Sequence, residues 1–243
     1  MEKHKKSYII SSFEVDFKQK LRIHSLFNLF QDLADEHAEK LGLSYTFCSQ
    51  NGLGWVGGAY HVKISRLPTW GEKITIETWP SGTTAAAAIR DFKMMDDDGN
   101  VLVCATSQWV LIDINRLRPL PIAKHLPHYD TIPERALDSD FAKILTPEIS
   151  PNDISFPVHT DDIDLNHHVN NALYPTWALD GVPEAFYNEN QVTEIQVTFR
   201  RPARLGDVLV MKTYRDGGQS ISVMGTQDGT IEFARVRLVW QAR

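Results

Sequence analysis

The sequence predicts an α+β protein that is built twice, with one helix and one antiparallel sheet in each half. Two observations lead to this prediction. A turn motif recurs about half a chain apart, and each copy follows a single helix-like segment and is itself surrounded by strand-like segments. An apolar helix followed by a long antiparallel meander can bury its apolar face only if the sheet wraps around it.

The recurring segment occupies residues 64–72 and again residues 199–207. Each copy begins with an apolar residue, and an arginine, a glycine and an acidic residue follow at matching offsets. These are Arg66, Gly71 and Glu72 in the first copy and Arg201, Gly206 and Asp207 in the second. The flanking segments show the period of two that is typical of strands. We therefore predict an internal duplication with a strand, turn, strand unit in each half.

Each half is expected to contain one main helix. In residues 25–41, Leu26, Phe30 and Leu33 recur at helical spacing, and Gly42 can end that helix. The second helix runs from Asn171 to about Gly181. After each helix we expect only strands. These are residues 54–64, 72–80, 86–96 and 100–112 in the first half, and 192–200, 207–215, 219–227 and 230–241 in the second.

Residues 113–154 are rich in proline and charge, which predicts a surface linker with one short helix over residues 137–145. The expected organisation is an N-terminal domain over residues 1–112, this linker over residues 113–154, and a C-terminal domain over residues 155–243.

The composition excludes several classes of protein. With 243 residues, of which 42% are hydrophobic, the chain can build a substantial core. A formal charge of −6 argues against a nucleic-acid partner. The two cysteines, Cys48 and Cys104, form neither a disulfide framework nor a metal-ligand spacing, so we expect no metal. No apolar run is long enough to cross a membrane, and no signal core follows the charged N-terminal residues. We expect a cytoplasmic protein without a membrane partner.

The most informative stretch is residues 164–171, where the carboxylate of Asp164, the amide of Asn166 and the imidazole of His168 alternate. In an extended segment, alternate side chains leave on the same side, so all three would face one pocket. A helix would instead place Asn166 roughly opposite the other two. We therefore expect an extended conformation here. A polar turn or cap is the alternative interpretation of such a string.

The residues that follow, Val169, Asn170 and Asn171, lie at the expected start of the second helix, which Asn170 or Asn171 can cap. Backbone N–H groups at a helix start favour an oxygen that becomes negative during a reaction. We expect these three N–H groups to form an oxyanion site. Together with a carboxylate, an amide and an imidazole, such a site suits acyl transfer to water, which needs neither a metal nor a cofactor.

Six strings occur in order along the chain: Trp55-Val56, residues 66–71, Glu77-Thr78-Trp79, Arg90-Asp91-Phe92, residues 105–110 and residues 164–171. Together they resemble the fatty acyl–acyl carrier protein thioesterases of plants and bacteria. The resemblance implies a tandem (double) hotdog fold, in which each half is an antiparallel sheet wrapped around a central helix. It also implies a role in fatty acid biosynthesis. The implied reaction is hydrolysis of the thioester that joins a fatty acyl chain to the phosphopantetheine arm of acyl carrier protein.

The same resemblance assigns the family's catalytic Asp, Asn and His to Asp164, Asn166 and His168. In the plant enzymes an acidic residue and a cysteine follow the paired basic residues of the next strand, whereas this chain has Pro202 and Ala203 there. We therefore expect no cysteine nucleophile. Asp164 is expected to attack the thioester directly or to activate water, Asn166 to hold the carboxylate or the water, and His168 to transfer protons.

We expect one active site per chain, because residues 20–25, taken as the matching stretch of the first half, lack the carboxylate and the amide. The first half would then form the acyl-chain pocket, with Trp55 and Ala59 as lining residues. A tryptophan on a strand is also common as plain core. His37, on the apolar stripe of the first helix, is interpreted as a core or boundary histidine.

Acyl carrier protein is strongly acidic, so its docking surface should gather basic residues. The candidates are Arg200, Arg201 and Arg204, together with Arg116, Arg118 and Lys124 of the linker. Solvated surface charge is the alternative. A duplicated hotdog supplies its own pairing, so a monomer and a homodimer both stay open. The alternative functions are an acyl-coenzyme A thioesterase, a non-catalytic acyl-thioester binding protein and a hotdog dehydratase.

Overall fold

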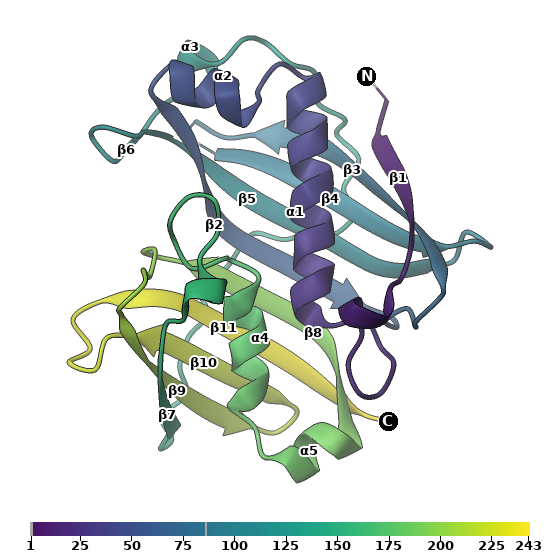
Figure 1. The fold of residues 1–243 in the computed structure, drawn as a ribbon, viewed down its shortest axis with the longest axis vertical. Coiled ribbons are helices and arrows are strands. Elements are labelled where there is room, and N and C mark those ends of the chain that lie inside the picture. The colour runs from purple at the N-terminus through teal and green to yellow at the C-terminus, as the bar shows by residue number, and fades with distance from the viewer. Residues whose placement is uncertain (1, 86) are drawn as a thin grey trace. The chain divides into compact units, whose positions relative to one another are not determined.

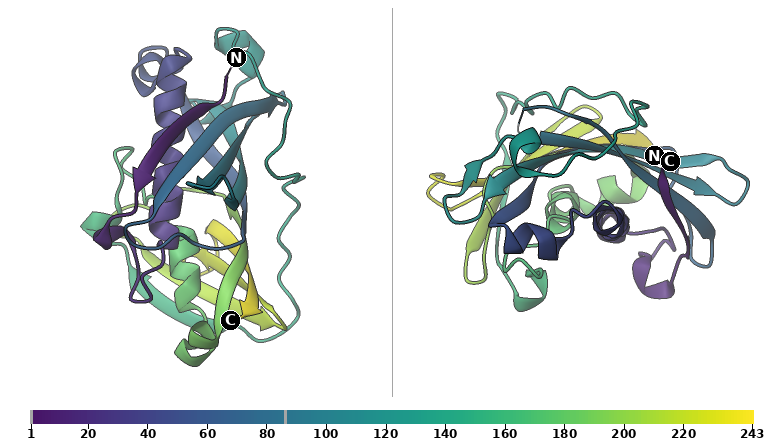
Figure 2. Two further views of the ribbon diagram at one scale, coloured as in Figure 1. Left: turned by 90° about the vertical axis from the view of Figure 1, so that its right-hand side faces the viewer. Right: turned by 90° about the horizontal axis from the view of Figure 1, so that it is seen from above.

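The computed structural model describes residues 2–85 and 87–243, and the chain divides into two compact units, residues 1–140 and 141–243. Each unit is an antiparallel sheet with a helix packed against one of its faces (Figure 1). Figure 2 shows the same arrangement of helix and sheet from two further sides. Among the described residues, no helix combines the length and the apolar composition needed to span a membrane.

In the first unit the strand order is β1-β3-β4-β5-β2, and a short strand, β6, pairs with β5. The main helix, α1 (Ile23–Lys40), packs against β3 and β1. Its strands are β1 (His4–Ile9), β2 (Leu53–Ile64), β3 (Lys73–Thr83), β4 (Ala87–Asp96), β5 (Val101–Asp113) and β6 (Arg118–Pro119). The shorter helices are η1 (Ser12–Glu14), α2 (Tyr45–Gln50) and α3 (Ile122–His125).

The second unit repeats this plan, with the strand order β7-β9-β10-β11-β8. Its main helix, α4 (Leu173–Asp180), packs against β11, β10 and β8. The strands are β7 (Asn152–Pro157), β8 (Asn190–Phe199), β9 (Val208–Asp216), β10 (Gln219–Gly225) and β11 (Glu232–Ala242). The shorter helices are η2 (Thr160–Asp162) and α5 (Glu184–Glu189). Because the order matches that of the first unit strand by strand, the predicted duplication is confirmed.

The first main helix lies close to where the apolar spacing predicts it. Leu26, Phe30 and Leu33 are fully buried. The helix ends in a left-handed turn at Gly42, whose φ is +72°. Gly42 N–H donates to Glu39 O at 3.0 Å and Leu43 N–H donates to Ala38 O at 2.9 Å, so the last carbonyls of the helix are satisfied.

Several sequence-based expectations about elements are wrong. Helices α2 and α5 follow the main helices, where only strands were expected, and the edge strands β1 and β7 were missed. Residues 137–145 are not helical. Their backbone is bonded to distant partners instead, since Leu137 N–H donates to Asp91 and Arg235 donates to Ile144 O at 2.8 Å. The edge strands and residues 137–145 depend on partners far away in the sequence, which local periodicity does not report.

Part of the predicted linker is bound tightly to the sheet of the first unit through Asp91 on β4. The Asp91 side chain is fully buried and accepts from Arg135 Nε at 3.0 Å, from Ala136 N–H at 3.0 Å and from the Ser81 hydroxyl. Beside it, Trp79 Nε1 donates to Glu134 O at 2.7 Å. This stretch of the chain is therefore held along β3 and β4 by a buried carboxylate.

Replacing Asp91 by alanine should lower the free energy of unfolding by about 3 kcal/mol, as measured by urea denaturation. This lies at the low end of the range for breaking a buried ion pair, because the Arg135 side chain keeps 30% of its surface exposed. Asp97→Ala is the matched control, since Asp97 forms an exposed pair with Lys73 and its loss should cost less than about 1 kcal/mol. Equal small losses in both variants would contradict the anchoring role of Asp91.

Candidate active site

Residues 164–169 form a tight turn, so the expected extended conformation is wrong. Asp164 N–H donates to His168 O at 2.8 Å, and His167 N–H donates back to Asp164 O at 3.0 Å. An antiparallel bridge between Ile163 and Val169 closes the turn. The Asp164 carboxylate stabilises it from within, because Oδ1 accepts from Asn166 N–H at 2.8 Å. An aspartate that bonds the backbone two residues on is a common way to build such a turn.

The turn places the three predicted catalytic side chains differently. Asp164 and His168 stand opposite each other at its base and are half-buried, whereas Asn166 is exposed at its tip. The backbone of Asn166, not its amide side chain, bonds the carboxylate. The structure therefore brings a carboxylate and an imidazole to the same end of one turn and leaves the amide side chain accessible from outside.

The structure leaves fewer backbone N–H groups available to an oxyanion than the sequence predicts. Val169 N–H donates to Ala203 O at 2.9 Å and Asn170 N–H donates to Asp162 O at 2.8 Å, so neither group is available to a substrate. Helix α4 begins at Leu173, and Asn170 Oδ1 accepts from Ala172 N–H at 2.9 Å. The oxyanion role expected of Val169 and Asn170 is not supported. Asn171 N–H has no acceptor within the described residues.

The turn before β9 supports the candidate site from the side. Ala203, which occupies the position of the plant cysteine, is fully buried. Its carbonyl accepts from Val169 N–H, and its own N–H donates to Tyr174 Oη at 3.3 Å. Burial raises the pKa of Tyr174 to about 12, so the phenol stays protonated at neutral pH. This position carries no reactive side chain, and it links the candidate turn to α4.

The electrostatic surroundings of His168 favour the neutral imidazole. Burial lowers its pKa, the positive charge of Arg204 lowers it further, and Asp164 acts in the opposite direction. A neutral imidazole at pH 7 can accept a proton. Burial also raises the pKa of the Cys48 and Cys104 thiols, which disfavours the reactive thiolate at both positions.

Replacing Arg204 by glutamine should raise the pKa of His168, because a cation that disfavours the imidazolium is removed. Titration of the His168 ring protons by nuclear magnetic resonance measures the shift. Arg201→Gln is the control, since Arg201 does not contribute to the pKa shift of His168. A pKa that is the same in the wild type and in Arg204→Gln would show that Arg204 does not act on the imidazole.

The first unit contains the same turn at residues 16–21. Asp16 N–H donates to Lys20 O at 2.8 Å, and Asp16 Oδ1 accepts from Lys18 N–H at 2.9 Å. Gln19 has a φ of 59° and its counterpart His167 a φ of 60°. Asp16 is thus equivalent to Asp164, while lysines stand in place of Asn166 and His168.

The expected match over residues 20–25 is therefore wrong. The true counterpart lies four residues earlier and keeps the carboxylate. The aspartate is the one residue that the two turns have in common, so their equivalence is not recognisable from the sequence. Equivalent tethers confirm the structural match, since Leu21 N–H donates to Pro68 O at 2.8 Å, as Val169 N–H donates to Ala203 O at 2.9 Å.

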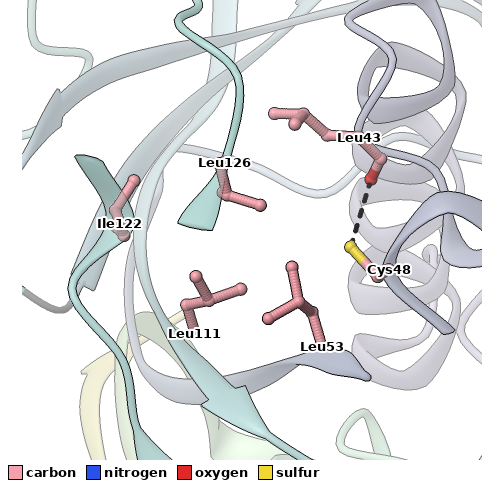
Figure 3. Packing of buried hydrophobic residues seen from close by; sticks show 6 residues of the cluster. All are labelled: Leu43, Cys48, Leu53, Leu111, Ile122 and Leu126. Atoms are coloured by element: carbon pink, nitrogen blue, oxygen red, sulfur yellow. Dashed lines mark hydrogen bonds between the residues drawn. The ribbon is translucent and has the colours of Figure 1, made fainter. Parts of the chain in front are cut away.

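A pocket opens between α1 and the sheet of the first unit. Its lining is mainly apolar or aromatic and includes Ala34, Leu41, Trp55, Trp109 and Tyr129. Trp55 lines it, whereas Ala59 is buried on the same strand but does not line it. One wall continues into a buried cluster that also includes residues near the beginning of the predicted linker (Figure 3). The cluster contains Leu43, Cys48, Leu53, Leu111, Ile122 and Leu126.

Sequence reasoning missed the charged groups of this pocket, Arg90 and Asp35. Arg90 donates to Thr78 Oγ1 at 3.2 Å and to His37 Nδ1 at 3.1 Å. Burial lowers the pKa of His37 to about 3 and that of Arg90 to about 10, so a neutral histidine accepts from a charged guanidinium. The interpretation of His37 as a core histidine is confirmed, and the string Arg90-Asp91-Phe92 was the signal that could have pointed to Arg90.

Two family models match the chain: the acyl-ACP thioesterase N-terminal domain over residues 1–128 and the acyl-ACP thioesterase C-terminal domain over residues 147–241. The chain belongs to the acyl-ACP thioesterase family. The chloroplastic acyl-[acyl-carrier-protein] hydrolase FATB3 of Cuphea viscosissima is 27% identical over 227 residues, which are 87% of this chain and 55% of that protein. The chloroplastic oleoyl-acyl carrier protein thioesterase 1 of Arabidopsis thaliana is 26% identical over 246 residues, which are 92% of this chain and 68% of that protein. The chain thus spans little more than half to two thirds of these curated relatives.

Solved structures of the family confirm the expected tandem hotdog fold. The 12:0-ACP thioesterase from Umbellularia californica matches with a TM-score of 0.84 and 25% identity, covering 98% of this chain and 97% of that one. An acyl-ACP thioesterase from Bacteroides thetaiotaomicron matches with a TM-score of 0.85 and 20% identity, covering 98% and 97%. The likeness to the Bacteroides protein is evidence for the fold alone.

Three arginines were expected to form a docking surface for acyl carrier protein: Arg200, Arg201 and Arg204. They lie between β8 and β9. Arg200 is partly neutralised by Glu232 at 3.6 Å. Arg201 and Arg204 are exposed and form no ion pair with the described part of the chain. Arg116, Arg118 and Lys124 are exposed residues of the first unit.

Proposed function

We propose that this acyl-ACP thioesterase hydrolyses the thioester of fatty acyl–acyl carrier protein to free fatty acid and carrier protein. The observation that carries the proposal is the carboxylate-capped turn, where Asp164 and a neutral His168 share one end. The relatives bear names of hydrolases that act on acyl carrier protein esters, and their family models span both units of this chain.

The surroundings of His168 favour attack by water. As water adds to the thioester carbon, the neutral imidazole takes one of its protons. Asp164 stabilises the resulting imidazolium, in keeping with its effect on the pKa of His168. The oxyanion would accept from Asn171 N–H, an interaction of a kind worth about 3 kcal/mol. The carbon–sulfur bond then breaks, the imidazolium returns its proton to the thiolate, and the acyl group leaves as a carboxylic acid.

Two further parts complete the proposal. Asn166, exposed at the tip of the turn, would orient the water or the thioester. The pocket of the first unit would receive the acyl chain, because its walls include Leu41, Trp55 and Trp109.

Asp164→Asn and His168→Ala should each lower kcat by about 10²- to 10⁴-fold, the usual contribution of a general acid or base. The assay is thiol release from a panel of acyl carrier protein thioesters of increasing chain length. Asp16→Asn is the matched control, because it makes the same change in the equivalent turn of the first unit and should leave kcat unaltered. Wild-type kcat in Asp164→Asn would refute the catalytic assignment.

The same panel, run beside the matching coenzyme A esters, separates the alternatives. Turnover that favours the carrier-bound substrates supports the proposed activity. Turnover with coenzyme A esters alone would identify an acyl-coenzyme A thioesterase. Binding of acyl thioesters without turnover of either series would identify a non-catalytic binding protein.

Charge reversal at Arg201 should raise the Michaelis constant for the carrier-bound substrate several-fold at low ionic strength and leave kcat unchanged. Arg201 is an exposed cation beside the candidate turn, and an acidic partner would be attracted to it. The effect should shrink as salt is added. Lys212→Glu, the same charge change on an exposed residue of β9, is the control. Equal Michaelis constants for wild type and Arg201→Glu would remove this residue from the docking proposal.

A further inference from the structure

Four large apolar side chains are exposed at one end of the first unit. Ile9 is 68% exposed, Phe13 78%, Phe17 78% and Trp70 61%. We call these four residues the first-unit patch. Large apolar groups gathered on a surface mark interaction sites more often than scattered ones do.

Backbone bonds hold the segments that carry this patch together. Trp70 N–H donates to Gln19 O at 3.3 Å, and Gly71 N–H donates to Ile10 O at 2.8 Å. An isolated bridge also joins Lys20 to Thr69. The loop after β1 accordingly lies beside the start of α1, at the end of the strands (Figure 1). The patch is therefore built on fixed turns.

The patch occupies the turns that correspond to the candidate active site of the second unit. Phe13 is equivalent to Asp161 and Phe17 to Leu165, because η1 and η2 and the turns after them form matching hydrogen bonds. Trp70 is equivalent to Leu205, because the duplicated turns before β3 and β9 are bonded in the same way. Leu165 and Leu205 are exposed as well, at 69% and 60%. Both copies thus present apolar groups, and the copy without the imidazole presents the larger aromatic ones.

The charged residues around the first-unit patch, which form its rim, also differ from those at the equivalent positions of the second unit. Lys18 and Lys20 stand where the second unit has Asn166 and His168. The acids of these loops are bonded to the turns themselves, since Glu14 accepts from Ser11 N–H at 2.7 Å and Asp16 accepts from Lys18 and Lys20 N–H at 2.9 and 3.0 Å. Because Glu14 and Asp16 correspond to the acids Asp162 and Asp164 of the second unit, the two lysines leave this rim with more positive charge than its counterpart.

We propose that the first-unit patch is a docking surface for the acidic carrier protein, separate from the contact proposed for Arg201, an inference that rests on the proposed function. Aromatic anchors within a basic rim suit a protein partner of opposite charge. A symmetric contact with a second copy of this chain would bring the lysines of both copies into one interface. Binding to an anionic bilayer typically uses clusters of about 4 to 8 cations, more than this rim provides.

The test is a calorimetric titration of the protein with carrier protein that bears the phosphopantetheine arm but no acyl group, so that no turnover occurs. In the double variant Phe13→Ser with Trp70→Ser the dissociation constant should rise about tenfold or more, and in Lys20→Glu it should rise several-fold. Leu145→Ser is the matched control, because Leu145 is 67% exposed and lies outside the patch. Unchanged affinity in both patch variants would overturn the proposal.

Kinetics with the acylated carrier protein separate this inference from the proposed function. The patch variants should show a raised Michaelis constant for the carrier-bound substrate, an unaltered kcat at saturation and unaltered rates with coenzyme A esters. An inactive wild type would refute the proposed function itself. Full activity with an unchanged Michaelis constant in the patch variants would refute the docking surface alone.

Two further measurements test whether a second copy of this chain or an anionic bilayer binds the patch instead. Sedimentation reports self-association, and flotation with vesicles of anionic phospholipid reports membrane binding. If the patch variants lost either property while keeping wild-type affinity for the carrier protein, the partner would be a second copy or a bilayer, and the proposal would be wrong.

Discussion

The candidate active site depends on one backbone hydrogen bond, from Val169 N–H to Ala203 O. This bond ties the turn that carries Asp164 and His168 to the turn before β9. Because Ala203 also donates to Tyr174, the same peptide unit connects the turn to helix α4. Arg204 follows directly and acts on the pKa of His168. A single tether therefore holds the turn that carries the imidazole beside the segment that carries Arg204, and it removes one N–H group from the expected oxyanion site.

The two units show which residues this scaffold needs and which are free to change. Each copy keeps an aspartate that caps the turn and an acid that closes the short helix before it. Gly71 and Gly206 both have a positive φ, at 78° and 92°, a conformation that side chains disfavour. These retained acids and glycines serve backbone geometry. The positions that differ project from the turns, so one copy can supply an imidazole and the other lysines.

Strand β4 of the first unit serves both faces of its sheet. Arg90 lines the pocket beside α1, whereas the next residue, Asp91, binds the chain that runs along the other side. Successive residues of a strand point to opposite faces, so two neighbouring charged groups support different structures. Arg90 places its own positive charge in a mainly apolar pocket. Asp91 fixes the stretch around Arg135, which the proline content of the chain predicted to be part of a surface linker.

Much of this protein was determined by its sequence alone. Helical spacing at Leu26, Phe30 and Leu33 located α1, and the repeated arginine, glycine and acid predicted the duplication, because these signals lie within one element or one turn. The six strings together identified the family, and the last of them, from Asp164 to Asn171, supplied the chemical groups. That string forms the polar turn that its residues allowed as the alternative, because bonds to Asp164 build the turn locally. Hydrogen bonds to Ala203 and Asp162, which the sequence does not report, fix where the turn lies.

The tertiary structure also decided which residues correspond between the halves, since matching tethers align Asp16 with Asp164 although their neighbours differ. It placed Trp55 and Arg90 in one pocket and left Ala59 outside it. The edge strands β1 and β7 likewise required their partners β3 and β9. The physical reason is the same in each case. A sequence reports local conformational preference and chemical identity, whereas bonds between distant segments determine which groups meet and which backbone donors are already used.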